Sequence, residues 1–242
     1  MEPHRGNILY QGQDLTSLNP NELRPFRRQM QMIFQDPFAS LNPRMTVGET
    51  IAEPMVVHGI TDKSGASEKS VEILKKVGLT ADYASRYPHE LSGGQRQRIG
   101  IARALAHEPN LIIADEAVSA LDVSIQAQVV NLMMELQEEF GLSYLFISHD
   151  MAVIERVCHR VAVMYLGEIV ELGTRSQVFE NPKHPYTKKL MSAVPIADPK
   201  LRKKELNLMT DEIPSLVKPI GYEPEKIDLI KIEEGHYIKP YN

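Results

Sequence analysis

The feature that most restricts the fold is a short apolar segment over residues 111–114, followed directly by Asp115 and Glu116. A continuous apolar run of this length is typical of a strand buried on both faces, as in a parallel sheet. Apolar side chains then recur at helical spacing over residues 125–140, and a second strand pattern covers residues 143–148. Strand, helix and strand form one crossover unit, right-handed by strong preference. We therefore predict an α/β fold with a mostly parallel sheet.

The rest of the chain is interpreted in the same way. The pattern between residues 47 and 106 is helical and interrupted, which predicts a helical subdomain inserted between strands. Ser67 is expected to cap one of its helices, over residues 68–77. The other expected elements are a helix at 20–30, strands at 31–34, 161–165 and 168–172, and helices at 175–180 and 185–193. Beyond residue 198 the pattern is irregular, so we divide the chain into a domain over residues 1–197 and an extension over 198–242.

Composition and charge exclude several classes of protein. With 27 basic and 32 acidic residues the net charge is -5, which gives no surplus to neutralise nucleic-acid phosphates. The single cysteine, Cys158, is expected to be buried in a helix and cannot form an internal disulfide, which favours a reducing cytosol. No segment approaches the roughly 18 to 20 apolar residues that a spanning helix requires. A chain of this kind that works at a membrane has to dock onto something that spans it.

Two acids at the carboxyl end of a buried strand lie at the sheet edge where α/β proteins bind ligands. In nucleotide hydrolysis one carboxylate holds Mg²⁺, usually through water, and its neighbour polarises the attacking water. Asp115 fits the first role and Glu116 the second. Taken alone, the same pair also fits the start of a plain loop before a helix.

A second motif, Leu-Ser-Gly-Gly-Gln at residues 91–95, opens a helix that is expected to run to about residue 106. Its glycines let the backbone approach a ligand, and a helix N-terminus directs unpaired amides and a positive dipole outward. Such a turn can bind an anion, although a serine before a helix is also common as a simple cap. The motif lies about twenty positions ahead of the Asp-Glu strand, and this combination is much rarer than either part.

At this point the chain resembles the ATP-binding subunits of ABC transporters. The corresponding motifs of that family are the signature motif at residues 91–95, the Walker B strand at 111–116, the D-loop at 119–122, the switch histidine at His149 and the Q-loop glutamine at Gln35. Their order and spacing match over roughly residues 7–194. The resemblance implies a P-loop NTPase-like core, a helical signature subdomain and a C-terminal extension.

The resemblance also implies ATP and Mg²⁺ as cofactors and assigns roles near the phosphates. Glu116, His149 and Gln35 would be catalytic, and Asp115 together with Gln35 would hold Mg²⁺. The chemistry is reasonable, because His149 can donate a hydrogen bond to a transferring γ-phosphate and an amide can ligate Mg²⁺ or bond to water. Each residue has an ordinary alternative: a structural histidine after a buried strand, and an unremarkable loop glutamine.

Five further residues would contact the nucleotide from across a subunit interface. In the family, two ATP-binding subunits associate head to tail, and the signature serine and glycine complete the ATP site of the opposite subunit. The residues expected to bind the nucleotide are Ser92, Gly93, Gly94, Gln95 and Asp122. ATP would then cross-link two chains, identical or different, and closure would drive the transporter.

Within the family the chain is most similar to oligopeptide and dipeptide importer subunits. The similarity rests on Phe-Gln-Asp-Pro at residues 34–37, Ser-Leu-Asn-Pro at 40–43 and His-Pro-Tyr-Thr at 184–187, and nickel importers share part of it. It implies transmembrane permease subunits as partners, an extracellular substrate-binding protein as an indirect one, no nucleic acid, and a peripheral place on the cytoplasmic face of the cell membrane. The chain departs from the family pattern in two places. It has Ala117-Val118 where the family usually has Pro-Thr, and residues 221–242 lack the cysteine cluster that many peptide-importer subunits carry in this tail.

The P-loop that should precede these motifs is missing, since none of the 14 glycines is followed by lysine. The early strands, the adenine-stacking aromatic residue and the central helix of the family are missing with it. We expect an N-terminally truncated importer ATPase, because loss of a central strand and helix would expose apolar faces at a cost far above the ~5–15 kcal/mol stability of a domain. The alternatives are a non-hydrolysing partner that supplies only the signature motif, a regulatory subunit, and an ABC-type DNA-repair ATPase, which would need a basic surface or a long coiled coil.

Overall fold

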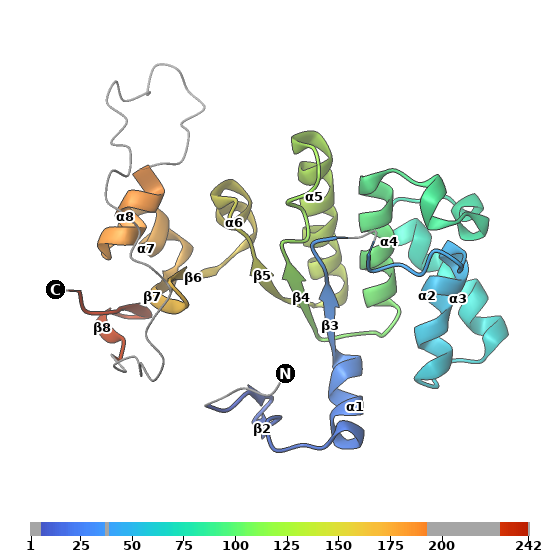
Figure 1. Cartoon of the computed structure of the whole chain (residues 1–242), viewed down its shortest axis with the longest axis horizontal. Helices are drawn as coiled ribbons and strands as arrows, with labels where there is room; N and C mark the ends of the chain where they lie inside the picture. The colour runs from blue at the N-terminus through green and yellow to red at the C-terminus, as the bar shows by residue number, and fades with distance from the viewer. Residues whose placement is uncertain (1–5, 37–38, 193–227, 242) are drawn as a thin grey trace, which may run out of the picture. The chain divides into compact units, whose positions relative to one another are not determined.

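The computed structural model describes residues 6–36, 39–192 and 228–241 (Figure 1). The chain divides into two compact units, Met1–His149 and Asp150–Asn242. The domain boundary predicted at residues 197 and 198 lies outside the described residues and stays a prediction. Among the described residues, every helix is too short or too polar to cross a bilayer.

The first unit contains a parallel sheet, a small hairpin and a group of helices. Its elements are β1 (Leu9–Tyr10), β2 (Gln13–Asp14), α1 (Pro20–Gln29), β3 (Met30–Ile33), α2 (Val47–Val57), α3 (Lys63–Lys76), the 3₁₀ helices η1 (Ala81–Ser85) and η2 (Pro88–Glu90), α4 (Gly93–Leu105), β4 (Leu111–Asp115), α5 (Val123–Phe140) and β5 (Ser143–Ile147). Strands β3, β4 and β5 pair in parallel in that order, and Met30, Leu111 and Ser143 lie in register. The predicted parallel α/β core is confirmed.

The helical subdomain is held together by apolar side chains that lose almost all contact with water. Ile51 of α2, Leu74 of α3 and Ile99 of α4 are each less than 2% exposed. One predicted boundary is wrong: α3 begins at Lys63, and its N-cap is Asp62 instead of Ser67. The Asp62 carboxylate accepts a hydrogen bond from the Gly65 amide at 2.8 Å. This hydrogen bond satisfies one of the amides that lack a partner in the first turn. The helix has therefore already begun before Ser67.

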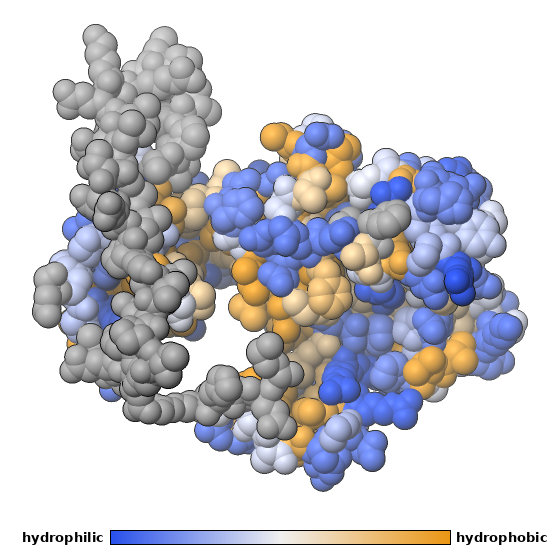
Figure 2. Space-filling model, viewed as in Figure 1, coloured by the Kyte–Doolittle hydropathy of each residue, from blue (hydrophilic) through white to orange (hydrophobic). Residues whose placement is uncertain are grey.

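The two faces of the parallel sheet differ in how well they are covered. Ile112 and Ala114 are fully buried on one face. On the other face, Leu145 and Ile147 of β5 are 53% and 45% exposed, and they pair in register with Ile113 and Asp115 of β4. Figure 2 shows hydrophobic residues on the surface over these strands. Within the described residues this apolar face is only partly covered.

The second unit contains an antiparallel sheet. Its elements are α6 (Met151–Val157), β6 (Arg160–Tyr165), β7 (Glu168–Thr174), α7 (Arg175–Glu180), α8 (Pro185–Ser192), β8 (Ile230–Glu233) and β9 (His236–Ile238). The strand order is β6-β7-β9-β8. The hairpin of β8 and β9 was not predicted, because its strands are short and β9 pairs with β7, which lies more than 60 residues earlier in the chain. Gly235, with φ +70°, was the local signal for its turn.

A buried hydrogen bond fastens this hairpin to the rest of the unit. The Glu171 carboxylate on β7 and the His236 ring on β9 are both 0% exposed, and His236 Nε2 donates to Glu171 Oε1 at 2.8 Å. The backbone amides of Lys183 and His184, just before α8, donate to the same carboxylate at 2.9 Å each. Burial by itself would raise the pKa of Glu171, but these hydrogen bonds outweigh it and hold the pKa below its ordinary value of 4.5.

We predict that Glu171→Gln weakens the second unit by about 3 kcal/mol, because it leaves His236 and two amides facing a poorer acceptor in a buried place. The ionised carboxylate stabilises the fold fully above pH 4.5, and this contribution is lost as the pH falls through the lower folded pKa. The variant should lack that pH dependence. Hydrogen exchange of the β7 and β9 amides, followed from pH 7 down to acid, measures both effects.

Glu168→Gln on the same strand is the matched control. Glu168 pairs with Lys239 on the surface, and its side chain is 47% exposed. Exposed pairs of this kind contribute about 0–1 kcal/mol, so the control should leave exchange in β7 and β9 nearly unchanged. Equal protection in both variants would contradict the stabilising role of Glu171.

Candidate functional site

The three predicted catalytic residues follow three neighbouring strands of the parallel sheet. Gln35 comes after β3, Glu116 after β4 and His149 after β5. Because the carboxyl ends of parallel strands meet at one edge of a sheet, the fold brings these side chains together. Gln35 Nε2 donates to Glu116 Oε2 at 2.6 Å, and His149 Nδ1 lies 3.3 Å from Glu116 Oε1. We refer to these three residues as the Glu116 cluster.

The backbone of Glu116 adopts an unusual conformation that its neighbours hold in place. Its φ is +46°, in the left-handed region that non-glycine residues seldom occupy. Its N–H donates to Ile147 O at 2.9 Å, and its carbonyl oxygen accepts from the amide and the hydroxyl of Ser119 at 3.1 and 2.9 Å. Ala117 and Val118, which replace the usual Pro-Thr of the family, are each 1% exposed. The direction of the carboxylate is therefore set by hydrogen bonds on both sides of the turn.

The cluster is open to solvent on the histidine side. The side chain of His149 is 72% exposed and that of Glu116 is 30% exposed. With Nδ1 directed at the carboxylate, Nε2 is the ring nitrogen left for a further partner. An anion such as a phosphate could reach the histidine without displacing any buried side chain.

Asp115, the predicted magnesium ligand, is the last residue of β4 and is partly buried. Within the part of the chain that the structure describes, no group of three or more His, Cys, Asp or Glu side chains is placed to form a metal centre. Mg²⁺ needs fewer protein ligands, because it usually keeps several waters and binds substrate phosphates. Since Gln35 Nε2 donates to Glu116, its amide oxygen is the end that remains to act as a ligand, together with the Asp115 carboxylate. This oxygen donor set fits Mg²⁺.

The predicted signature residues begin α4. Ser92 is the N-cap, its Oγ accepts from the Gln95 amide at 3.3 Å, and Gln95 Oε1 accepts from the Ser92 amide at 2.9 Å. The other end of the Gln95 side chain donates to the Tyr83 hydroxyl at 2.9 Å. Gly93 and Gly94 occupy the first turn of the helix, where backbone amides have no intrahelical partner. We refer to residues 92–95 as the signature turn.

Among the described residues, no hydrogen bond joins the signature turn to the Glu116 cluster. Gln95 bonds to Tyr83, and the two glycines face Leu121 and Ile125. Asp122, the fifth predicted nucleotide-binding residue, is the N-cap of α5, but its side chain makes no capping hydrogen bond. The chain thus carries two separate groups of candidate residues.

Sequence reasoning missed two residues that position these groups. Tyr83 in η1 holds Gln95, and nothing in the local sequence pattern points to it. Ser119 supports the backbone of Glu116 and lies in the D-loop segment, but no role had been predicted for it. Both contacts are made between elements or across a turn, so spacing in the sequence does not indicate them.

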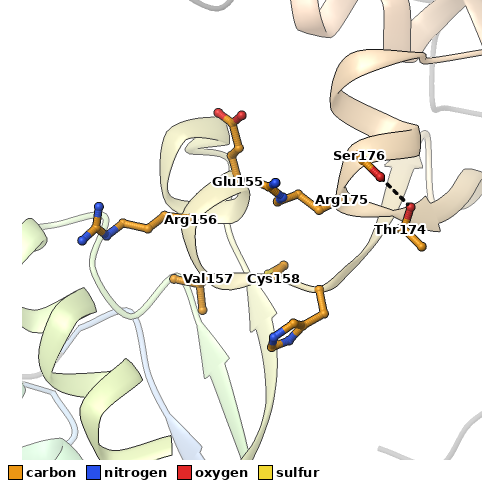
Figure 3. A pocket seen from close by; sticks show the side chains of 8 residues that line it. Glu155, Arg156, Val157, Cys158, Thr174, Arg175 and Ser176 are labelled. Carbon is orange, nitrogen blue, oxygen red and sulfur yellow. Dashed lines mark hydrogen bonds between the residues drawn. The ribbon is translucent and has the colours of Figure 1, made fainter. Parts of the chain in front are cut away.

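A cavity of about 310 Å³ in the second unit is lined by residues 155–159 and 174–176 (Figure 3). Cys158 lies here at the C-cap of α6, only partly buried, so the prediction of a buried helix residue was wrong. The boundary differs because α6 ends at Val157 and the chain turns into β6. Burial raises the pKa of the Cys158 thiol, which disfavours the reactive thiolate.

Two family models match the chain. Residues 1–119 match the model of the ABC transporter family, and residues 170–221 match the C-terminal region of oligopeptide/dipeptide transporters. The second match includes β7 and α8, which Glu171 connects.

Curated relatives extend the match over almost the whole chain. The glutathione import ATP-binding protein GsiA of Pectobacterium atrosepticum is 56% identical over 238 residues, and that of Escherichia coli is 54% identical over the same length. These regions are 98% of this chain but 38% of each relative, so the chain spans well under half the length of these relatives.

Solved structures match in fold. The bacterial ABC transporter cassette MJ0796, solved as a dimer, is 30% identical with a TM-score of 0.65, and the match covers 72% of this chain and 75% of that one. CbiO1 of Clostridium perfringens, part of the ABC transporter complex cbiONQ, is 26% identical with a TM-score of 0.67 over 75% of this chain and 70% of that one. These matches confirm the predicted ABC ATPase core. The chain belongs to the ABC transporter family, with an ATP-binding cassette core and a region of the oligopeptide/dipeptide transporter C-terminal type.

Proposed function

We propose that this chain is the ATP-binding part of an ABC importer that couples ATP hydrolysis to the uptake of oligopeptides, dipeptides or glutathione. The observation that carries the proposal is the Glu116 carboxylate held between Gln35 and His149 at the edge of a parallel sheet. The names of the glutathione import relatives support the substrate class, since glutathione is itself a small peptide.

In this proposal each residue of the Glu116 cluster has a role in hydrolysis. Asp115 and the amide oxygen of Gln35 hold Mg²⁺, which supplies charge neutralisation at the phosphates. Glu116 polarises the attacking water, and His149 donates from its second ring nitrogen to the γ-phosphate. Displacement of the Gln35 amide from Glu116 would free one carboxylate oxygen for that water.

The signature turn serves a second subunit. Ser92, Gly93, Gly94 and Gln95 lie apart from the Glu116 cluster, which supports a role in completing the ATP site of an opposite chain in a head-to-tail dimer. Asp122, with its carboxylate not used as a cap, would join that interface. The other proposed partners are transmembrane permease subunits, and the place of action is the cytoplasmic face of the membrane. The dimeric MJ0796 cassettes support such an arrangement.

The missing P-loop bears on what the chain does alone. We propose that a P-loop-bearing strand and helix normally cover the apolar face of the β3-β4-β5 sheet, and the exposure of Leu145 and Ile147 supports this. The alternative is a non-hydrolysing partner that contributes only its signature turn. The capping box of that turn is complete without any P-loop, which is the observation in favour of the alternative.

The first prediction is that the chain as given neither binds ATP tightly nor hydrolyses it, because no lysine and backbone cradle is present for the β- and γ-phosphates. Equilibrium binding of labelled ATP and a phosphate-release assay test this. Hydrolysis at the ordinary rate of an ATPase would contradict the claim that the missing P-loop disables this chain.

The second prediction concerns a version of the chain in which a P-loop segment has been restored. There Glu116→Gln should leave ATP binding within a few-fold but lower turnover by about 10² to 10⁴, because the amide cannot act as a base. Glu138→Gln, at an exposed position near the C-terminal end of α5, serves as a control for the same chemical change. Unchanged hydrolysis in Glu116→Gln would remove Glu116 from its proposed role.

The third prediction separates truncation from the partner alternative. Leu145→Glu should change the stability of the chain as given by less than about 1 kcal/mol, because the side chain is already half exposed. In the P-loop-restored version the same change should cost about 3 kcal/mol or more, because the carboxylate would be buried under the added helix. Thermal unfolding of both versions measures the difference. Equal small costs would show that the added segment does not cover this face.

A further inference from the structure

The first turn of α4 and the first turn of α5 approach each other unusually closely at Gly94. A methyl group on Gly94 would overlap the Cγ2 methyl of Ile125, far inside van der Waals contact. The Ile125 side chain has little room to move away, since a β-branched side chain in a helix keeps essentially one χ1 rotamer. A methyl group on the neighbouring Gly93 would make only ordinary van der Waals contact, with Leu121 Cδ2 at 3.7 Å. The signature turn therefore rests on the beginning of α5 and on the loop before it.

The signature turn makes a second contact through Gln95. The Tyr83 hydroxyl accepts from Gln95, and the Tyr83 ring lies under the Arg86 guanidinium at 4.0 Å from its centroid. Arg86 in turn pairs with Asp82 at 2.5 Å. The turn is thus held between a hydrogen bond from η1 and an apolar contact from α5.

These contacts change the reason for a glycine at position 94. A glycine in this motif was expected to let the backbone approach a nucleotide. The structure adds a requirement inside the chain, because only a residue without Cβ leaves space for the Ile125 methyl. Ile125 lies in the first turn of α5, just after Asp122 at its N-cap, so its contact with Gly94 places the signature turn next to the start of α5.

We propose that Ile125 is a positioning residue for the signature side of the nucleotide site. Its Cγ2 methyl, seated on Gly94, holds the amides of the signature turn and the Asp122 loop in one fixed arrangement, so that both meet the opposite subunit together. The proposal rests on the function proposed above. Ile125 itself touches neither nucleotide nor reacting atoms and acts through Gly94.

A matched pair of variants isolates the Cγ2 methyl. Ile125→Val keeps Cγ2 and removes only the terminal methyl, whereas Ile125→Leu keeps the number of carbons but moves the branch away from the backbone. Hydrogen exchange of the Gln95 and Arg96 amides, which donate to Ser92, is expected to be about tenfold faster in the leucine variant of the full chain than in the valine variant. Exchange rates within twofold of each other would overturn the proposal.

A double-mutant cycle tests the contact in a second way. Gly94→Ala alone should lower Tm, because its Cβ meets Ile125. In the Ile125→Ala background the same change should raise Tm, because alanine is a better helix former than glycine once the methyl is gone. A change of sign supports the contact. Additive shifts of the same sign would contradict it.

The role in nucleotide binding needs a readout that packing alone would not move. The chain as given is mixed with a P-loop-restored version carrying Glu116→Gln, and ATP·Mg²⁺-dependent association is measured by sedimentation. Ile125→Leu in the chain as given should weaken association ~10-fold or more, because a misplacement of about 1 Å at a site is costly. Ile125→Val should stay within twofold.

The outcomes distinguish the two proposals. If the unmodified chain does not associate in an ATP-dependent way, the proposed function fails, and the positioning role fails with it. If the unmodified chain associates and the leucine and valine variants do so equally well, only the positioning role of Ile125 is overturned. Weaker association of the leucine variant alone, at unchanged Tm, supports it.

Discussion

The parallel pairing of β3, β4 and β5 is the constraint on which the candidate site depends. Each strand is followed by one chemically important side chain, and parallel strands deliver their carboxyl ends to the same edge. Gln35, Glu116 and His149 are far apart in the sequence, yet they meet within hydrogen-bond distance because of this alignment. An antiparallel neighbour would place one of them at the other end of the sheet.

The backbone at the end of β4 adds the finer adjustment. Glu116 occupies a left-handed conformation that costs energy, and the hydrogen bonds to Ile147 and Ser119 offset that cost. The buried pair of small apolar residues that follows, Ala117 and Val118, keeps the turn packed without the proline and threonine usual in the family. The departure from the family pattern therefore leaves the turn packed and the acid in place.

The signature turn is organised by different forces. Its capping box is local, but the turn also contacts Tyr83 of η1 and Ile125 of α5. In the second unit, the buried Glu171 carboxylate performs a comparable task, since it joins β7, β9 and the start of α8 by accepting from three donors in the interior. In both places a few specific contacts connect elements that local propensity alone would leave independent.

The sequence by itself determined the elements with strong local signals: the parallel core from the apolar run at residues 111–114 and the helix after Ser92 from its cap. It also singled out Asp115, Glu116, His149 and Gln35 as candidates, and their roles stay a prediction. It did not determine the start of α3, where Asp62 takes the cap, or the hairpin of β8 and β9. Local patterns report side-chain periodicity and capping chemistry over one or two turns. Only the tertiary structure decided which side chains touch, such as Glu116 with its two partners and Gly94 with Ile125, because those contacts join segments whose separation in the sequence carries no periodic signal.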